Sequence, residues 1–138
     1  MKDPRMATRA VPHPASRLEI EGPDGRWHVQ LEDSAATRDL LALMPLTLEL
    51  EDFGVSEKIA MLPRRLRHPD APEGVAPVAG DLAYYAPWGN LAIFRRDFRY
   101  SPGLVRLGRI TTPLAALRGT GRLRVTLRQA PRDFGAPR

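Results

Sequence analysis

The chain has 138 residues, enough for one domain of ordinary size and too few for two. It contains no cysteine, which excludes disulfide frameworks, thiolate zinc sites, iron–sulfur clusters and cysteine nucleophiles. Hydrophobic residues make up 43% and charged residues 27%, which is typical of a soluble globular domain, and no apolar run approaches the roughly 20 residues that cross a bilayer. The first residues lack the apolar segment of a secretory signal, so we expect a cytoplasmic protein with no membrane partner.

The formal net charge is +5, but its distribution does not favour nucleic-acid binding. Residues 1–17 carry +3 and residues 118–138 carry +5, whereas residues 18–117 carry −3. A specific nucleic-acid module is expected to have a basic stripe with interleaved aromatic residues on its folded body. We therefore expect no specific nucleic-acid partner, and at most weak adhesion of the basic ends to anionic surfaces.

The first part of the chain predicts an arm followed by a β-hairpin. Residues 1–16 contain three prolines and no hydrophobic period, which is typical of a disordered N-terminal arm. From Arg17 onward, two segments of alternating apolar residues surround a Gly-Pro-Asp-Gly turn at 22–25, and this pattern predicts a hairpin. Its apolar positions are Leu18, Ile20, Trp27, Val29 and Leu31.

A helix and a half-buried strand are predicted next. Asp33 or Ser34 can cap a helix that Pro45 would end. The apolar side of this helix consists of Leu40, Leu41 and Met44. Residues 46–51 alternate strictly between apolar and polar side chains, so they predict a strand with its leucines inward.

Between residues 53 and 80 the sequence predicts little extended structure. After a break at Phe53-Gly54, Ser56 and Glu57 can start a short helical turn that Pro63 would close. Residues 68–80 contain three prolines and two glycines, which predict a long surface loop. Long loops of this kind in compact domains are often functional.

Further strands are predicted at 81–86, 91–94, 104–110 and 123–127. The first two are joined by a tight turn, Pro87-Trp88-Gly89-Asn90, in which the glycine supplies a positive φ. Thr111 or Thr112 can cap a short helix from Pro113 to Leu117. The last residues, 130–138, predict a C-terminal tail.

These elements amount to about seven or eight short strands and two or three short helices, without the alternation of strand and helix that a parallel sheet requires. An antiparallel sheet of this size leaves exposed edges unless it closes on itself. We therefore predict an all-β domain over residues 17–129, a closed eight-stranded antiparallel barrel, with a β-sandwich as the second choice.

Three blocks of sequence carry a family resemblance: MPLTLELEDFGVSEKIAMLPRRL at 44–66, GDLAYYAPWGNLAIFRRDF at 80–98 and YSPGLVRLGRI at 100–110. Together they resemble the bacterial cyclophilin-like family, small domains of largely unassigned function. The resemblance extends from about Leu18 to Leu127. It implies the closed eight-stranded barrel of cyclophilin-class peptidyl-prolyl isomerases, in agreement with the strand count, but a shared fold does not establish a shared function.

Cyclophilin catalysis depends on an arginine in an F-H-R block, with a phenylalanine and a Q-G-G-D segment lining the proline pocket. This sequence has no F-H-R block, and Ala79-Gly80-Asp81 reproduces only the end of the second segment. We therefore assign no catalytic residue from the resemblance.

Other kinds of chemistry have little support in the sequence. The three histidines, His13, His28 and His68, have neither a G-x-S-x-G neighbour nor metal-ligand spacing, so hydrolase and metal sites are not expected. Phosphate-binding glycine motifs are absent as well. We expect no metal and no cofactor.

The candidate site lies in a segment rich in aromatic residues, between 84 and 100. Alternation sends Tyr84 and Tyr85 to opposite faces of their strand. In one interpretation Phe94 and one of these tyrosines simply fill the barrel. In the other, an open groove for a peptide or a small planar ligand is lined by Tyr85, Trp88, Asn90 and Tyr100.

Arg64 and Arg65 are the candidate cations of this groove, where a guanidinium could bind an anion or a carbonyl group. The alternative is that both belong to a solvated helix end, where positive charge complements the helix dipole.

The leading hypothesis is a binding domain for a small molecule or a peptide segment, without demonstrable catalysis. A divergent peptidyl-prolyl isomerase is the second hypothesis. The third is a structural or oligomerisation module whose aromatic patch is a subunit interface. We expect a monomer or a weak homodimer.

Overall fold

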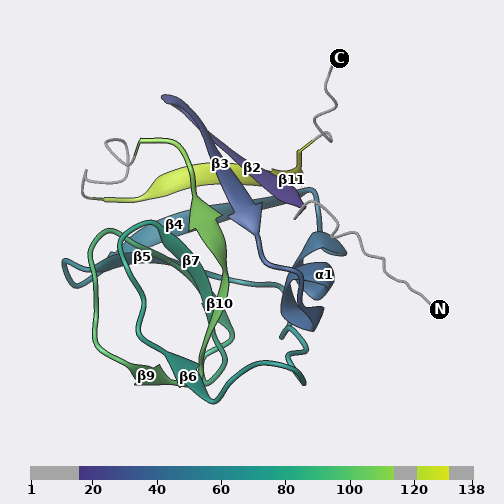
Figure 1. The fold of residues 1–138 in the computed structure, drawn as a ribbon. Coiled ribbons are helices and arrows are strands. Elements are labelled where there is room, and N and C mark those ends of the chain that lie inside the picture. Colours follow the sequence, from purple (N-terminus) through teal and green to yellow (C-terminus); the bar gives the residue numbers. More distant parts are fainter. Residues whose placement is uncertain (1–15, 114–120, 131–138) are drawn as a thin grey trace.

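The computed structural model describes residues 16–113 and 121–130. Within these ranges eight strands form a closed antiparallel barrel in the order β10-β3-β2-β11-β4-β5-β8-β7 (Figure 1). Their bounds are β2 Arg17–Gly22, β3 Gly25–Leu31, β4 Leu46–Phe53, β5 Glu57–Met61, β7 Asp81–Tyr85, β8 Asn90–Phe94, β10 Leu104–Ile110 and β11 Leu123–Gln129. The predicted fold class is confirmed.

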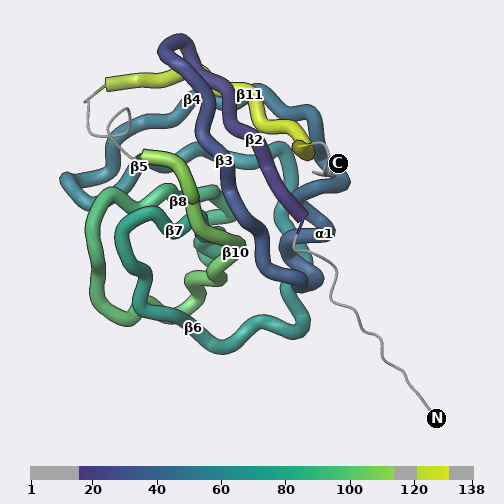
Figure 2. Tube along the Cα trace, turned by 45° about the horizontal axis from the view of Figure 1, so that its top comes forward, coloured from purple at the N-terminus to yellow at the C-terminus, as the bar shows by residue number. Residues whose placement is uncertain are grey.

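The barrel closes through its last strand. β11 pairs with β4, where Val125 lies opposite Leu48, and also with β2, where Leu127 lies opposite Ile20. The first and last barrel strands therefore lie side by side, and both views of the chain show this (Figures 1 and 2). Closure gives every barrel strand a partner on each side, which removes the exposed edges of an open sheet.

The predicted β2–β3 hairpin is present in the expected register. Leu18 lies opposite Val29 and Ile20 opposite Trp27, and all four side chains are buried. The apolar alternation read from the sequence is thus the alternation between the inside and the outside of the barrel.

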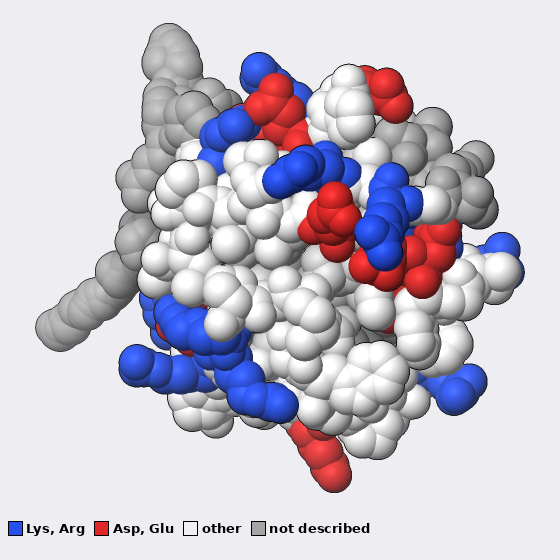
Figure 3. Space-filling view, turned by 180° about the vertical axis from the view of Figure 1, so that it is seen from behind, with Lys and Arg blue, Asp and Glu red and all other residues white. Residues whose placement is uncertain are grey.

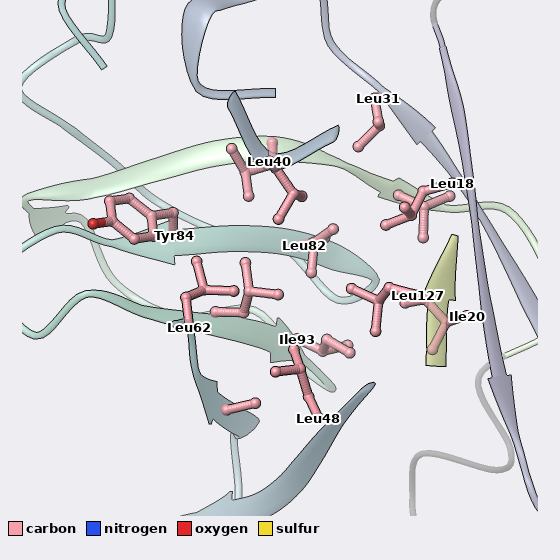
Figure 4. Packing of buried hydrophobic residues seen from close by; sticks show 14 of the residues in the cluster. Leu18, Ile20, Leu31, Leu40, Leu48, Leu62, Leu82, Tyr84, Ile93 and Leu127 are labelled. Carbon is pink, nitrogen blue, oxygen red and sulfur yellow. The ribbon is translucent and has the colours of Figure 1, made fainter. Parts of the chain in front are cut away.

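The one helix among the described residues, α1 (Ala35–Leu41), packs beside the barrel (Figure 1). Ser34 is its N-cap, and the Ser34 hydroxyl and the Thr37 side chain bond each other's backbone N–H groups in a capping box. Leu40 is fully buried and lies among the leucines of the strands (Figure 4). The helix thus contributes directly to the hydrophobic core.

The helical turn predicted at Ser56–Leu62 is wrong, because residues 57–61 form β5. This strand pairs with β4 on one side and over its whole length with β8 on the other. Lys58 and Ala60 point inward, whereas Glu57 and Ile59 belong to the outer face. Hydrogen bonding to two neighbouring strands outweighs a local helix-capping signal. The third predicted helix, from Pro113 to Leu117, falls almost entirely outside the described residues.

Two hydrophobic clusters lie on the two faces of the barrel wall. The inner cluster includes Tyr84, which fills the barrel together with leucine, isoleucine and valine side chains (Figure 4). A smaller outer cluster consists of Ala83, Ala92, Phe94 and Leu104. The interpretation that Phe94 fills the barrel is therefore wrong: it alternates with the inward Ile93 and is buried on the outside.

The predicted loop 68–80 is only partly irregular. Within it, β6 (Gly74–Val75) pairs with β9 (Ser101–Pro102) in a separate two-stranded sheet. This small sheet ties the loop to the segment that follows β8, and both pack toward the outer cluster through Val75 and Phe98. No helix among residues 16–113 and 121–130 has the length and hydrophobicity to span a membrane.

Candidate functional site

A groove of about 330 Å³ lies on the outer face of the barrel wall, above the outer cluster. Its base is apolar, with Ile59 from β5, Phe94 from β8 and Leu104 from β10. Its remaining lining residues are Phe53, Glu57, Tyr85, Trp88, Asn90, Phe98, Arg99, Tyr100, Ser101 and Pro102. Strands thus form the floor, and the 86–89 turn and the 95–102 segment form the walls.

Four of the predicted site residues line this one groove. Tyr85 ends β7, Trp88 lies in the turn that follows, and Asn90 begins β8. Tyr100 immediately precedes β9, on the other side of the groove. Gly89 adopts φ +74°, as expected for the tight turn that carries Trp88.

Trp88 is the central aromatic side chain of the site. Its ring meets Phe53 edge to face at a centroid distance of 5.5 Å and Tyr85 at 5.7 Å. Even so, 51% of its surface is exposed. The two edge contacts hold the indole in place and leave it accessible to a ligand.

Arg64 and Arg65 are not among the groove residues. Arg64 forms a bidentate ion pair with Asp39, at 2.9 and 3.0 Å. Hydrogen bonding to Arg64, and then to the Arg67 backbone N–H, holds the pKa of Asp39 below its usual value. The interpretation of a solvated helix end is also wrong, because the element that ends just before these arginines is the strand β5.

Arg65 instead supports the turn that carries Trp88. Its Nη1 donates a hydrogen bond to the Ala86 carbonyl at 2.7 Å. A Cβ added to Gly89 would lie 3.5 Å from the Arg65 side chain, so the arginine packs along this turn. Its role in the described structure is to position the turn.

Glu57 is the most informative groove residue that sequence reasoning missed. It is half-buried, and its burial raises the pKa of its carboxyl group, although a hydrogen bond from Ser56 partly opposes this. Among the described residues no basic side chain forms an ion pair with its carboxylate. Arg95 donates a hydrogen bond to the Glu57 backbone carbonyl at 3.4 Å, but its guanidinium pairs with Asp52. If residues 57–61 had been predicted as a strand, the two-residue period would have placed Glu57 on the same face as Ile59, which lines the groove.

Asn90 brings an unsatisfied polar atom to the groove. Its side chain is 2% exposed, and Nδ2 donates to the Leu91 carbonyl at 2.9 Å. Oδ1 is buried and accepts no hydrogen bond from any described residue. An unpaired buried acceptor costs free energy, which a ligand with a suitable donor could recover.

Arg99 is the one basic residue among the described lining residues, and it was not among the predicted site residues. Its guanidinium carbon lies 4.6 Å from the centre of the Phe98 ring, which is a cation–π arrangement. Phe98 in turn lies 6.3 Å from Phe94. In this wall of the groove the positively charged guanidinium of Arg99 thus lies on the face of the Phe98 ring.

Charged side chains elsewhere are largely paired with opposite charges. Arg26 lies 3.1 Å from Glu19, and Arg106 lies 3.0 Å from the buried Asp81. The face in Figure 3 accordingly has basic and acidic groups next to one another around a broad area without charged side chains. Among the residues that the structure describes, no three histidine or acidic side chains are close enough to hold a metal ion.

Comparison with known proteins places the fold in a family. The sequence model of a family described as the cyclophilin-like family matches residues 20–128. The solution structure of a hypothetical protein from Archaeoglobus fulgidus superimposes with a TM-score of 0.69 at 19% sequence identity, covering 91% of this chain and all of that one. No curated protein matches the sequence.

Proposed function

Because the chain belongs to the cyclophilin-like family, whose barrel here bears an aromatic groove, we propose that it is a binding domain for a small molecule or a short peptide segment. The observation that supports this most is the environment of Trp88. Two aromatic neighbours fix its ring beside a groove of about 330 Å³, yet half of its surface remains exposed. Pockets of this size and apolar character, with a few polar groups, are typical of ligand sites.

The polar groups of the groove are few and concentrated. Asn90 offers a buried acceptor, Glu57 a half-buried carboxyl group and Arg99 an exposed guanidinium. A ligand with an apolar body would bind to the aromatic walls, and its polar atoms would be oriented by these three groups.

Arg99 favours a second candidate function, a divergent peptidyl-prolyl isomerase. An arginine beside an apolar groove is the arrangement that could weaken the resonance of a bound prolyl amide. Against this, Arg99 stacks on Phe98, and the sequence lacks the F-H-R block of cyclophilins. A protease-coupled assay with proline-containing tetrapeptides tests it, since acceleration lost in Arg99→Ala would establish isomerase activity.

The binding function is tested by a thermal-shift screen of metabolites and proline-containing peptides against the full chain. We expect ligands that raise the Tm of the wild type and fail to raise that of Trp88→Ala. Val55→Ala is the matched control, because Val55 is 68% exposed and lies outside the groove. If no compound acts, or if Trp88→Ala responds like the wild type, the proposal fails. A concentration-dependent mass in light scattering, abolished by Trp88→Ala, would favour an oligomerisation module instead.

A further inference from the structure

A row of aromatic side chains surrounds Glu57 in the barrel wall. In the strand register Glu57 lies opposite Phe53 of β4 on one side and opposite Phe94 of β8 on the other. Side chains directly opposite in neighbouring strands have their Cβ atoms about 5 Å apart. The Glu57 side chain therefore leaves the barrel wall between those of Phe53 and Phe94.

The row continues beyond both phenylalanines. Phe53 contacts Trp88 at a centroid distance of 5.5 Å, and Phe94 contacts Phe98 at 6.3 Å. All five of these side chains line the groove. Glu57 is thus the one carboxyl group among the described groove residues, and it lies in the middle of this aromatic row.

The charge of this carboxyl group has no counter-ion among residues 16–113 and 121–130. Arg99 also lines the groove, but its guanidinium stacks on Phe98 and forms no ion pair with a described carboxylate. Burial without an opposite charge disfavours the ionised form, and this is the cause of the raised pKa of Glu57. A bound cation would remove this penalty.

We propose that the groove binds an organic cation, a ligand whose ammonium or guanidinium group pairs with Glu57 between the rings of Phe53 and Phe94 while its apolar body packs on Trp88. This inference rests on the proposed binding function and specifies the ligand class. Aromatic rings attract cations through their negatively charged faces, most strongly where water is excluded. The chain already provides an example, since Arg99 stacks on Phe98 at 4.6 Å.

Asn90 contributes at the other end of the groove. It lies opposite Met61, four residues along β5 from Glu57, a distance of about 13 Å along a strand. Its Oδ1 has no hydrogen-bond donor among the described residues, so it complements a second donor on an elongated ligand. Glu57 and Asn90, two polar acceptors that line the groove, thus both select hydrogen-bond donors.

The test uses three probes of similar shape: 2-phenylethylamine, 2-phenylethanol and 3-phenylpropionate. Each is titrated into the 15N-labelled full chain and followed by NMR at the Trp88 indole N–H and the side-chain amide of Asn90, the only asparagine in the sequence. The indole of Trp27, which is 5% exposed in the core, is the internal control. We expect the amine to bind about tenfold more tightly than the alcohol, as an ion pair among aromatic rings implies.

Glu57→Gln separates the role of the charge from that of the shape. It should weaken amine binding by about tenfold and leave the alcohol unaffected. Glu51→Gln, an exposed glutamate of β4 outside the groove, should change neither.

Three results would overturn the cation assignment and still support a binding groove. The amine and the alcohol bind with equal affinity, the amine affinity is unchanged in Glu57→Gln, or the carboxylate probe binds most tightly. If none of the three probes shifts the Trp88 resonance, the cation assignment fails. The broader screen with Trp88→Ala then decides separately whether the binding function fails too.

Discussion

Tyr84 and Tyr85 are adjacent in β7 and serve opposite faces of the same barrel wall. Tyr84 is fully buried in the interior, where its hydroxyl accepts a hydrogen bond from the Leu66 backbone N–H at 3.1 Å. Tyr85 is half-buried on the outside, with its ring 5.7 Å from that of Trp88. Two adjacent residues of β7 therefore belong one to the hydrophobic core and the other to the groove.

Replacing the two tyrosines by phenylalanine should separate these roles. Tyr84→Phe leaves the buried Leu66 N–H without an acceptor, and we expect the free energy of unfolding to fall by about 1–3 kcal/mol. Tyr85→Phe removes a hydroxyl with no hydrogen-bond partner among the described residues and should leave stability nearly unchanged. Urea denaturation of both variants measures the difference, and equal midpoints would contradict this account.

Lys58 should be far more important for stability than a surface cation. It is 1% exposed, and its Nζ donates to Asp52 at 2.8 Å and to the Gly121 carbonyl at 2.9 Å. Lys58→Met would leave both acceptors without this donor, so we expect a large fall in Tm. Arg38→Met is the matched control, because Arg38 pairs with Asp33 at a similar 2.7 Å with both side chains exposed, and it should cost little. Similar losses in the two variants would refute the prediction.

The ionised side chain of Glu57 should destabilise the unliganded protein at neutral pH. Because burial raises its folded-state pKa above the ordinary 4.5, the folded state is penalised as pH rises from 4.5 through the folded-state pKa. Glu57→Gln should therefore have a higher Tm than the wild type at pH 7 and the same Tm below about pH 4. Thermal unfolding across this range measures the effect. If the Tm values of Glu57→Gln and the wild type differ by the same amount at all pH values, ionisation of Glu57 is not the cause of the difference.

Asp39 should show the opposite dependence. The Arg64 hydrogen bonds, with the Arg67 backbone N–H, lower its pKa from the ordinary 3.8. Its contribution to stability is then present above pH 3.8 and is lost as pH falls through the folded-state pKa. Asp39→Asn should have a lower Tm than the wild type at pH 6, and the gap should narrow in acid. If the gap widens as the pH falls, the ion pair does not act as described.

The lack of a side chain at Gly74 should be necessary for the position of Tyr100 in the groove wall. A Cβ at this position would lie 2.5 Å from the Ser101 carbonyl oxygen and 2.9 Å from the Tyr100 ring. Gly74→Ala must push β6 and β9 apart and displace Tyr100, so we expect ligands of the groove to bind at least several-fold more weakly. Gly22→Ala is the control, since its Cβ would make only ordinary contacts, the nearest at 3.6 Å. Equal binding by both variants would show that the wall tolerates this displacement.

Sequence patterns predicted the barrel well where burial is periodic. The hairpin from Arg17 to Leu31 follows directly from alternation, because one face of each strand is buried. β5 was mistaken for a helical turn, because Ser56 and Glu57 resemble a helix start and the pairing with β8 is invisible locally. The same error hid Glu57 from the candidate site.

The site itself was only partly predictable. Tyr85, Trp88 and Asn90 are close in sequence and share one hairpin, so their proximity could be inferred. Phe53 and Glu57 reach the groove because β5 pairs with β4 and β8, and no local pattern encodes these pairings. Arg99 lies beside the predicted Tyr100, in the segment that follows β8. The strands β6 and β9 have only two residues each, too few to show a hydrophobic period, and they are strands only because they pair with each other.

The position of β11 between β2 and β4 has a consequence for synthesis on the ribosome. Until residues 123–129 have left the exit tunnel, β2 and β4 each lack one of their two neighbours, and the nascent chain exposes two unpaired strand edges. The cylinder can be completed only after translation of its final strand. A stop codon before residue 123 would thus release a chain with an open seam.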